Sequence, residues 1–236
     1  MQYDRIQKGV FLSRPNRFIA FVRTEEGKEE KVHVPNTGRC RELLLPGATV
    51  FLSEGSNPAR KTKYDLVAVE KVLPCAGTLL INMDSHITNA VAEEYLLKNN
   101  LFADIFPSLP DVKKEVISGT SRFDFLLEKG EKKLFLEVKS VTLEDNGIVL
   151  FPDAPTLRGV KHLEELIRLK KEGFFSAVLF VVQLEKAKEF RPNSQTHPEF
   201  AQTLKKAFEN GVKILVMTCK VTPESIFLDS PIPFIL

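Results

Sequence analysis

The chain has few cysteines, no long apolar run and no strong excess of one charge, and each absence excludes a class of protein. Its three cysteines, Cys40, Cys75 and Cys219, form neither a CxxC pair nor an even-numbered disulfide framework, so we expect a protein of the reducing cytoplasm. The longest apolar runs, such as residues 177–182, are far shorter than the roughly 20 residues that span a bilayer. The first residues lack the apolar segment of a signal peptide, so we expect no export and no membrane partner. With 14 prolines and 12 glycines in 236 residues, the composition argues against disorder.

The net charge of +2 hides an uneven distribution. Residues 1–82 contain 13 Lys/Arg and 9 Asp/Glu, a net charge of +4, whereas residues 83–236 contain 20 and 22, a net charge of −2. The basic part suits a module that faces nucleic acid. The acidic part suits a phosphate-binding protein only if some of its carboxylates hold a cation.

The residue pattern changes near position 82, which predicts two domains, residues 1–82 and 83–236. The first domain has short strands and one helical turn, typical of a small OB-like β-barrel. The second alternates helices and strands, which predicts an α/β domain with a central mixed sheet, so the whole chain is α+β. The expected strands of the first domain are 17–23, 29–34, 48–52 and 64–72. The expected elements of the second are helices at 89–99, after Thr156 and at 199–210, and strands at 112–117, 123–127, 134–138, 177–183 and 212–218.

One predicted hairpin of the second domain carries a pair of carboxylates. With a two-residue turn at Gly130–Glu131, the numbers of paired residues sum to 261, which places Asp124 opposite Glu137. Lys139 shares the face of Glu137. We expect the opposite face to be wholly apolar and to belong to the core; its residues are Phe123, Phe125, Leu127, Leu134, Leu136 and Val138.

Two carboxylates directly opposite each other on a sheet repel and destabilise it. Protonation of one, a bridging Lys139, or a divalent cation between them would relieve the repulsion. A cation held by oxygen ligands and water suits Mg²⁺ or Mn²⁺, and the Lys139 ammonium can orient a water or stabilise charge on a phosphoryl oxygen. The alternative is a surface cluster of salt bridges.

The pattern Asp124-x(12)-Glu137-x-Lys139 resembles the restriction-endonuclease-like superfamily, written PD-(D/E)xK, although Phe123 stands in place of the proline. The resemblance implies that Asp124 and Glu137 bind the metal and that Lys139 helps to position the attacking water. Many members add an acidic residue from the preceding helix. Of Glu93 and Glu94 we predict Glu94, which lies near the apolar arc of that helix; a solvated glutamate is the alternative.

The helix after Thr156 presents reactive side chains on one face. Arg158, His162 and Glu165 have the spacing i, i+4, i+7, and Lys161 borders them. Such a row near a helix N-terminus could meet a phosphate, but the spacing alone favours an exposed charged face.

Motifs across most of the chain resemble, in order, those of the sugar fermentation stimulation protein family, SfsA. They are 14–18 (RPNRF), 33–40 (HVPNTGRC), 42–44 (ELL), 46–47 (PG), 123–125 (FDF), 137–142 (EVKSVT) and 151–163 (FPDAPTLRGVKHL). The resemblance implies an OB-like N-terminal domain, a restriction-endonuclease-like C-terminal domain and DNA binding. The family name refers to a phenotype in sugar use and specifies no reaction.

Basic side chains of the first domain cluster around two turns and one loop, where they could bind a phosphate backbone; they are Arg14, Arg17, Arg39, Arg41, Arg60, Lys61 and Lys63. Phe11, Phe18 or Phe21 could stack on bases, although a core position suits most of them better. Asn36 and Thr37 would border a groove.

Three hypotheses follow. The first is a Mg²⁺- or Mn²⁺-dependent nuclease in which Asp124, Glu137, Lys139 and Glu94 form the site. In that hypothesis Arg158, Lys161 and the basic residues of the first domain hold DNA, with RNA as the alternative polymer. A homodimer would suit an enzyme that cuts duplexes. The second is a DNA-binding regulator of sugar metabolism genes that does not use its nuclease fold. The third is an interaction protein whose hairpin carboxylates only form salt bridges.

Overall fold

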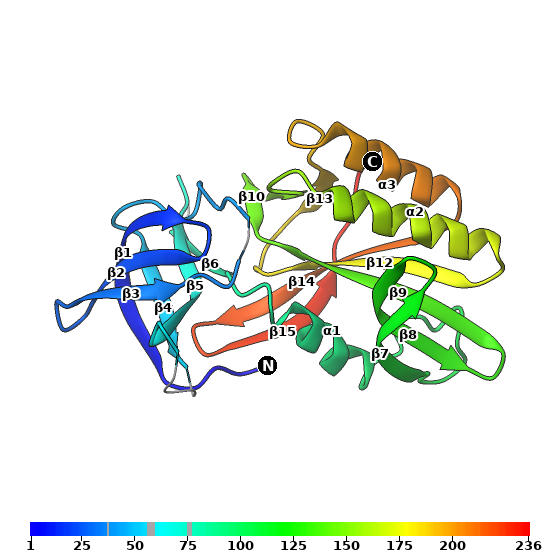
Figure 1. Ribbon diagram of the computed structural model, residues 1–236, viewed down its shortest axis with the longest axis horizontal. Helices are drawn as coiled ribbons and strands as arrows, with labels where there is room; N and C mark the ends of the chain where they lie inside the picture. Colours follow the sequence, from blue (N-terminus) through cyan, green and yellow to red (C-terminus); the bar gives the residue numbers. More distant parts are fainter. Residues whose placement is uncertain (37, 56–59, 75–76) are drawn as a thin grey trace.

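The N-terminal strands form a closed barrel. They are β1 (Ile6–Asn16), β2 (Ile19–Thr24), β3 (Glu29–His33), β4 (Thr49–Glu54), β5 (Tyr64–Val72) and β6 (Thr78–Asn82). Their order is β3-β2-β1-β4-β5-β6, and a pairing of β3 with β5 closes the first five strands. A Cβ atom on Gly9 would lie 2.6 Å from a methyl carbon of Val22, so the close approach of β1 and β2 requires glycine there. The computed structural model describes residues 1–36, 38–55, 60–74 and 77–236, and the predicted barrel is confirmed (Figure 1).

The rest of the chain forms a mixed sheet of six strands with three helices. The strands are β7 (Asp111–Ser118), β8 (Ser121–Lys129), β9 (Lys132–Val141), β12 (Phe175–Val182), β14 (Lys213–Thr222) and β15 (Ser225–Pro231), in the order β15-β14-β12-β9-β8-β7. The neighbours β9, β12 and β14 run parallel, and the others are antiparallel. A small second sheet contains β10 (Leu143–Asp145), β11 (Ile148–Phe151) and β13 (Glu189–Pro192). The predicted α/β domain with a mixed central sheet is therefore confirmed.

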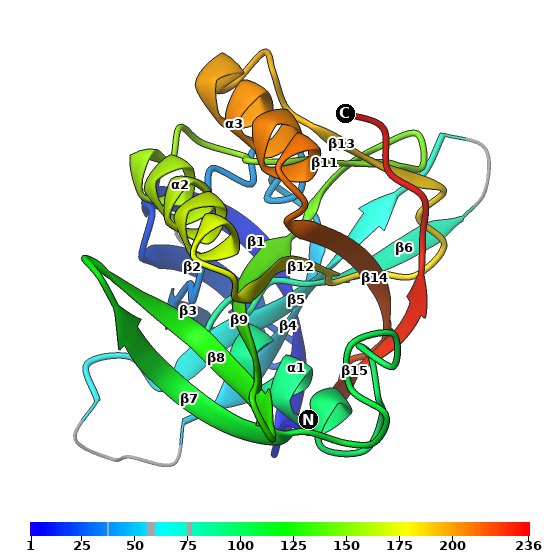
Figure 2. The same cartoon turned by 90° about the vertical axis from the view of Figure 1, so that its right-hand side faces the viewer.

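The helices cover both faces of the sheet. Alternate residues of β12 divide between two cores: Val178, Phe180 and Val182 pack towards α2 (Leu157–Lys171) and α3 (Pro198–Glu209), while the residues between them pack towards α1 (Thr88–Leu96). This alternation places α1 on the face opposite α2 and α3 (Figures 1 and 2). Within the described residues, no helix is long and apolar enough to cross a membrane.

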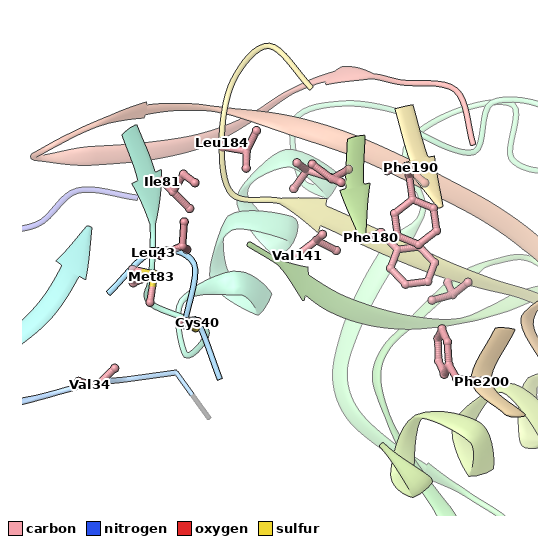
Figure 3. Close-up of a cluster of buried hydrophobic side chains, with 14 of the residues drawn as sticks. Val34, Cys40, Leu43, Ile81, Met83, Val141, Phe180, Leu184, Phe190 and Phe200 are labelled. Atoms are coloured by element: carbon pink, nitrogen blue, oxygen red, sulfur yellow. The ribbon is translucent and has the colours of Figure 1, made fainter. Parts of the chain in front are cut away.

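A single buried cluster connects the barrel to the sheet domain. It extends from Val34 and Cys40 of the barrel side through Ile81 to Phe180 and Phe200 beneath α2 and α3 (Figure 3). Because such a core is close-packed, we expect the barrel to keep a fixed position relative to the β8–β9 hairpin.

Most of the predicted elements are present, with a few omissions. Thr156 caps α2, since its side chain accepts a hydrogen bond from the Gly159 N–H at 3.0 Å. The pairs Phe125–Leu136 and Lys129–Lys132 of β8 and β9 have the predicted sum of 261. The strands β1, β6, β10, β11, β13 and β15 were not predicted.

Candidate functional site

Glu137 lies in the middle of β9 and is only 3% exposed. One carboxylate oxygen, Oε1, accepts hydrogen bonds from the Lys139 ammonium and from Nδ1 of His162 on α2. The other oxygen, Oε2, is buried and has no hydrogen-bond partner among the residues that the structure describes. Burial raises the pKa of Glu137, but the hydrogen bond from His162 and the charge of Lys139 outweigh burial and lower it. The group is therefore a carboxylate with one oxygen unused.

Asp124 is the second carboxylate, on β8, and it is held from the other face of the sheet. Its Oδ1 accepts from the Asn89 side chain of α1 at 2.8 Å, and its Oδ2 accepts from the Val138 backbone N–H at 2.7 Å. Burial raises the pKa of Asp124, and the charge of Glu137 raises it further. Asp124 thus lies close to Glu137, and no Lys, Arg or His of the described residues forms an ion pair with it, although the charge of Lys139 partly offsets the rise in its pKa.

The predicted arrangement of the hairpin faces is partly wrong. Phe123 does not belong to the face of Phe125: it packs beneath α2, with its ring centre 5.6 Å from that of Phe135. The regular β8–β9 pairs end at Phe125–Leu136, and the Asp124 carboxylate occupies the Val138 N–H instead of a backbone carbonyl. This local break lets Asp124 turn towards α1 while Glu137 meets α2.

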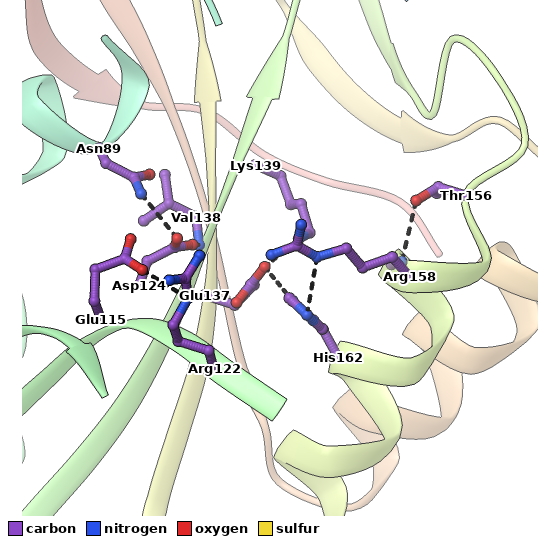
Figure 4. A network of polar contacts seen from close by, with 11 residues as sticks. Asn89, Glu115, Arg122, Asp124, Glu137, Val138, Lys139, Thr156, Arg158 and His162 are labelled. Atoms are coloured by element: carbon purple, nitrogen blue, oxygen red, sulfur yellow. Dashed lines mark hydrogen bonds and ion pairs between the residues drawn. The ribbon is translucent and has the colours of Figure 1, made fainter. Parts of the chain in front are cut away.

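Strand β7 continues the irregularity. The β7–β8 pairs sum to 239 on both sides of position 115, but the pair Glu115–Asp124 is missing from the ladder. Glu115 has a φ of 55°, an uncommon conformation for a residue with a side chain, and its carboxylate binds Arg122 at 2.7 Å. Three acidic residues, Glu115, Asp124 and Glu137, therefore occupy one row across three strands (Figure 4).

The α2 face contributes basic groups to the site, whereas the helical spacing alone favoured an exposed charged face; His162 is buried against Glu137. Nε of Arg158 donates to Nε2 of the buried His162 at 3.4 Å, and the Lys161 ammonium reaches the Thr120 carbonyl at 3.0 Å. Figure 4 shows Lys139, His162 and Arg158 gathered around Glu137. Glu165 instead pairs with Arg168 on the same helix.

The prediction that Glu94 completes a metal site is not supported. Its carboxylate binds the N-terminal ammonium at 2.7 Å and Lys98 at 3.0 Å. Glu93 pairs with Lys114 of β7. The α1 side chain that faces Asp124 is Asn89, because the helix turns the position one turn before Glu93 towards β8. Across the described ranges, no three His, Cys, Asp or Glu side chains are arranged to hold a metal ion.

Three arginines of the barrel have the exposed position expected of a nucleic-acid surface. Arg17, Arg39 and Arg41 are exposed and form no ion pair with any described residue. They line a groove of about 600 Å³. The Arg17 guanidinium lies 4.8 Å from the ring centre of Phe18, which is 46% exposed.

Arg14 is more engaged than its exposed neighbours, and its predicted role in nucleic-acid binding stays a prediction. Its guanidinium donates to the backbone carbonyls of Arg17, Asn36 and Arg39, each at 2.8 Å. These bonds hold the two turns that present the exposed arginines, and Arg14 itself also lines their groove. Thr37 lies outside the described residues.

The remaining basic and aromatic candidates of the barrel divide into free and engaged groups. Arg60 forms a two-pronged pair with Asp65, and Lys63 lies 3.8 Å from a carboxylate oxygen of Glu54. Lys61 is exposed. Phe11 is buried in the core, whereas Phe21 is 37% exposed.

A polar pocket connects the arginine groove with the sheet domain. It has a volume of about 360 Å³, shares Arg17 and Gly38 with the groove, and reaches the end of β9 and the start of α2. Asp153, before α2, accepts a hydrogen bond from the Cys40 N–H at 2.8 Å. A Cβ on Gly38 would lie 2.7 Å from the same carboxylate. The groove and the pocket are thus continuous, and the pocket reaches Ser140, three residues after Glu137 on β9.

Comparison with known proteins assigns the whole chain. Residues 12–78 match the model of the SfsA N-terminal OB domain, and residues 86–225 match that of the sugar fermentation stimulation protein RE domain. A sugar fermentation stimulation protein homolog of Clostridium beijerinckii is 52% identical over 236 residues, covering 100% of both chains. A homolog of Desulfitobacterium hafniense is 52% identical over 226 residues, covering 96% of this chain and 94% of its own.

A solved structure supports the same assignment. The structure of Pyrococcus furiosus SfsA in complex with Ca²⁺ superposes with a TM-score of 0.86 at 28% identity, covering 100% of this chain and 98% of that one. From the two domain matches, the full-length relatives and this superposition, the chain belongs to the sugar fermentation stimulation protein family.

Proposed function

We propose that this protein is a divalent-metal-dependent nuclease whose barrel binds the nucleic acid that the sheet domain cuts. The observation that carries the proposal is the buried, unpartnered Oε2 of Glu137, close to the second carboxylate of Asp124. A buried acceptor without a donor costs about 1–3 kcal/mol, and an oxygen-binding cation would remove that cost. The chemistry of this pair therefore fits Mg²⁺ or Mn²⁺.

Asp124 and Glu137 are the residues that would hold the cation. With Glu94 engaged elsewhere, water would complete the ligand set, which is the usual arrangement for Mg²⁺. The Ca²⁺ in the Pyrococcus furiosus relative supports this proposal, because Ca²⁺ also takes oxygen ligands.

The residues around the pair supply the remaining chemistry of phosphodiester hydrolysis. A divalent cation would supply Lewis-acid stabilisation and ease the deprotonation of water. Lys139, held against Glu137, would bring a positive charge next to a bound water or a phosphoryl oxygen. Arg158 is exposed at the first turn of α2, where it can bind the neighbouring phosphate.

The barrel is the proposed binding surface for DNA, with RNA as the other polymer to test. Its exposed Arg17, Arg39 and Arg41 can neutralise phosphates, and Phe18 can stack on a base. The polar pocket that shares Arg17 leads from this surface towards the end of β9, so one strand can contact both domains.

A cleavage assay tests the proposal. Full-length protein is incubated with labelled single-stranded DNA, duplex DNA and RNA in Mg²⁺, Mn²⁺ or EDTA. We expect cleavage of at least one polymer with a divalent metal and none in EDTA or with Asp124→Ala. The matched control is Glu131→Gln at the exposed tip of the same hairpin, which should cut like the wild type. Equal cleavage by wild type and Asp124→Ala would rule out the site.

A DNA-binding regulator without cleavage is the second candidate. It is favoured by the hydrogen bonds that already occupy both oxygens of Asp124 and by the lack of three gathered metal ligands in the described part of the chain. Binding would then weaken steeply with salt and be unaffected by Asp124→Ala. Gel-shift measurements at two salt concentrations, with and without metal, distinguish the two candidates.

A further inference from the structure

We propose that His162 and Arg158 are positioning residues that set the orientation of Glu137 for a divalent cation. This inference rests on the proposed function, because it concerns the same carboxylate pair. It adds a role for two side chains of α2 in the arrangement of that pair.

The hydrogen-bond geometry defines the order of the three groups. Nδ1 of His162 meets Oε1 of Glu137, and Nε2 of His162 meets Nε–H of Arg158 at 3.4 Å. Arginine can only donate, so Nε2 is the acceptor and the ring proton lies on Nδ1. The imidazole therefore donates to the carboxylate, and Arg158 favours the tautomer that does so.

The packing around His162 keeps this donor in place. The side chain is about 5% exposed, and its ring centre lies 6.1 Å from that of Phe123 in the core beneath α2. A ring held in this way cannot follow a rotation of the carboxylate. The donor consequently fixes the plane of the Glu137 carboxylate.

The two oxygens of the Glu137 carboxylate consequently differ in their contacts. Lys139 and His162 both use Oε1, and Oε2 remains buried without a donor. If these two donors served only to satisfy a buried glutamate, we would expect one of them on Oε2. Both lie on Oε1 instead. Partners of this kind behind metal ligands typically change metal affinity 10–100-fold when removed.

Titration of Mn²⁺ into metal-free, full-length protein by calorimetry, without nucleic acid, tests the inference. We expect His162→Phe, which keeps the ring and loses the donor, to weaken Mn²⁺ binding roughly 10–100-fold. In His162→Asn the amide nitrogen can stand where Nδ1 stands, so affinity should recover to within roughly threefold of the wild type, well short of the roughly 10–100-fold loss expected for a lost partner.

The control is His33→Phe. It breaks the corresponding pair in the barrel, where Nδ1 of His33 binds Asp65 at 2.7 Å, and it should leave Mn²⁺ affinity unchanged. Circular dichroism checks the folding of each variant. Should His162→Phe not fold, Arg158→Met, at an exposed position, takes its place, with an expected affinity loss of about tenfold, the lower end of the range for such partners.

Unchanged Mn²⁺ affinity in His162→Phe, or in Arg158→Met when it serves as the substitute, would overturn the inference, as would a wild type that binds no Mn²⁺. The outcome is separable from that of the nuclease proposal. Binding that depends on His162 without any cleavage would refute only the nuclease. Cleavage that persists with Mn²⁺ affinity unaffected by these variants would refute only the positioning role.

Discussion

Two aspartates, Asp65 in the barrel and Asp124 in the sheet domain, are both shielded from solvent but have opposite electrostatic surroundings. Burial raises the pKa of Asp65, but hydrogen bonds from Arg60 and His33 outweigh it, so the net shift is downward. Burial also raises the pKa of Asp124, and there the neighbouring charge of Glu137 adds to the effect, so the net shift is upward.

The difference separates a carboxylate that stabilises the fold from one that costs stability. The barrel gives Asp65 two basic partners from its own strands and loop. Within the described part of the chain, the hydrogen-bond donors to Asp124 are the neutral groups of Asn89 and Val138. Proteins tolerate uncompensated groups where function requires them, which is why we assign the cation to the second carboxylate and not the first.

The largest expected difference between the two regions is in how a substitution changes the cleavage rate. Glu137→Gln changes the charge and one oxygen of the site with almost no change in volume, and we expect it to lower the cleavage rate by roughly 10³-fold or more, as when a group at the reacting centre is lost. Asp65→Asn should leave the rate nearly unchanged. Single-turnover assays compare the two, and a similar loss in both would show that the effect is one of folding.

Stabilisation by metal should also belong to the sheet domain alone. A ligand at 100 times its Kd stabilises the folded state by about 2.7 kcal/mol. For a chain of this size that corresponds to a rise in Tm of roughly 5–10 °C. We expect this rise with Mn²⁺ in wild type and in Asp65→Asn, and none in Asp124→Asn. Thermal melts in Mn²⁺ and in EDTA measure it, and a rise that survives Asp124→Asn would place the cation elsewhere.

Without metal, we expect Asp65→Asn, and not Asp124→Asn, to be the less stable variant. Asp65→Asn removes charge-assisted hydrogen bonds to Arg60 and His33, each type worth about 1.5–3 kcal/mol; we expect a net loss of about 2 kcal/mol. Asp124→Asn relieves repulsion from Glu137, so its stability should equal or exceed that of the wild type. Urea unfolding at neutral pH in EDTA tests both, and a greater loss in Asp124→Asn would contradict the comparison.

The contributions of Asp65 and Asp124 to the free energy of unfolding should change with pH in opposite directions. The folded pKa of Asp65 is below its value in the unfolded chain, so its contribution is present above the unfolded pKa and is lost as the pH falls through the folded pKa. The folded pKa of Asp124 is raised, so the folded state binds the proton more tightly, and stability relative to Asp124→Asn falls as the pH rises through that range. Unfolding free energies of wild type and each variant between about pH 2 and pH 7, which covers the titration of folded and unfolded carboxylates, provide the test; parallel curves would refute the contrast.

Much of the fold could be predicted from the sequence because its signals are local. The turn at Gly130–Glu131 fixes the hairpin register, and Thr156 marks the start of α2. The strand β1 escaped prediction because Gly9 and Pro15 interrupt its pattern, although both are accommodated by the barrel.

The site was predicted less completely, because its geometry depends on contacts between distant elements. Alternation along β8 placed Phe123 on the wrong face, since nothing local announces that the Asp124 side chain replaces a backbone acceptor at Val138. The role of His162 depends on where α2 packs, which the helical spacing alone did not determine. Arg14 could not be told from its exposed neighbours, because only the folded turns reveal the carbonyls that it binds.

The smallest expected effect concerns the salt dependence of binding, and it compares free and engaged arginines within the barrel. Arg39 and Arg41 have no acidic partner among the described residues, whereas Arg60 is committed to Asp65. Each phosphate contact contributes about 0.9 to the slope of log K against log salt on duplex DNA. Arg39→Gln or Arg41→Gln should therefore reduce the slope by about 0.9 each, while Arg60→Gln should leave it unchanged. Fluorescence anisotropy with a labelled duplex over a range of salt measures the slopes, with Asp124→Ala in the background to prevent cleavage. If Arg60→Gln changed the slope as much as Arg39→Gln, the groove of exposed arginines would not be the surface that meets the phosphates.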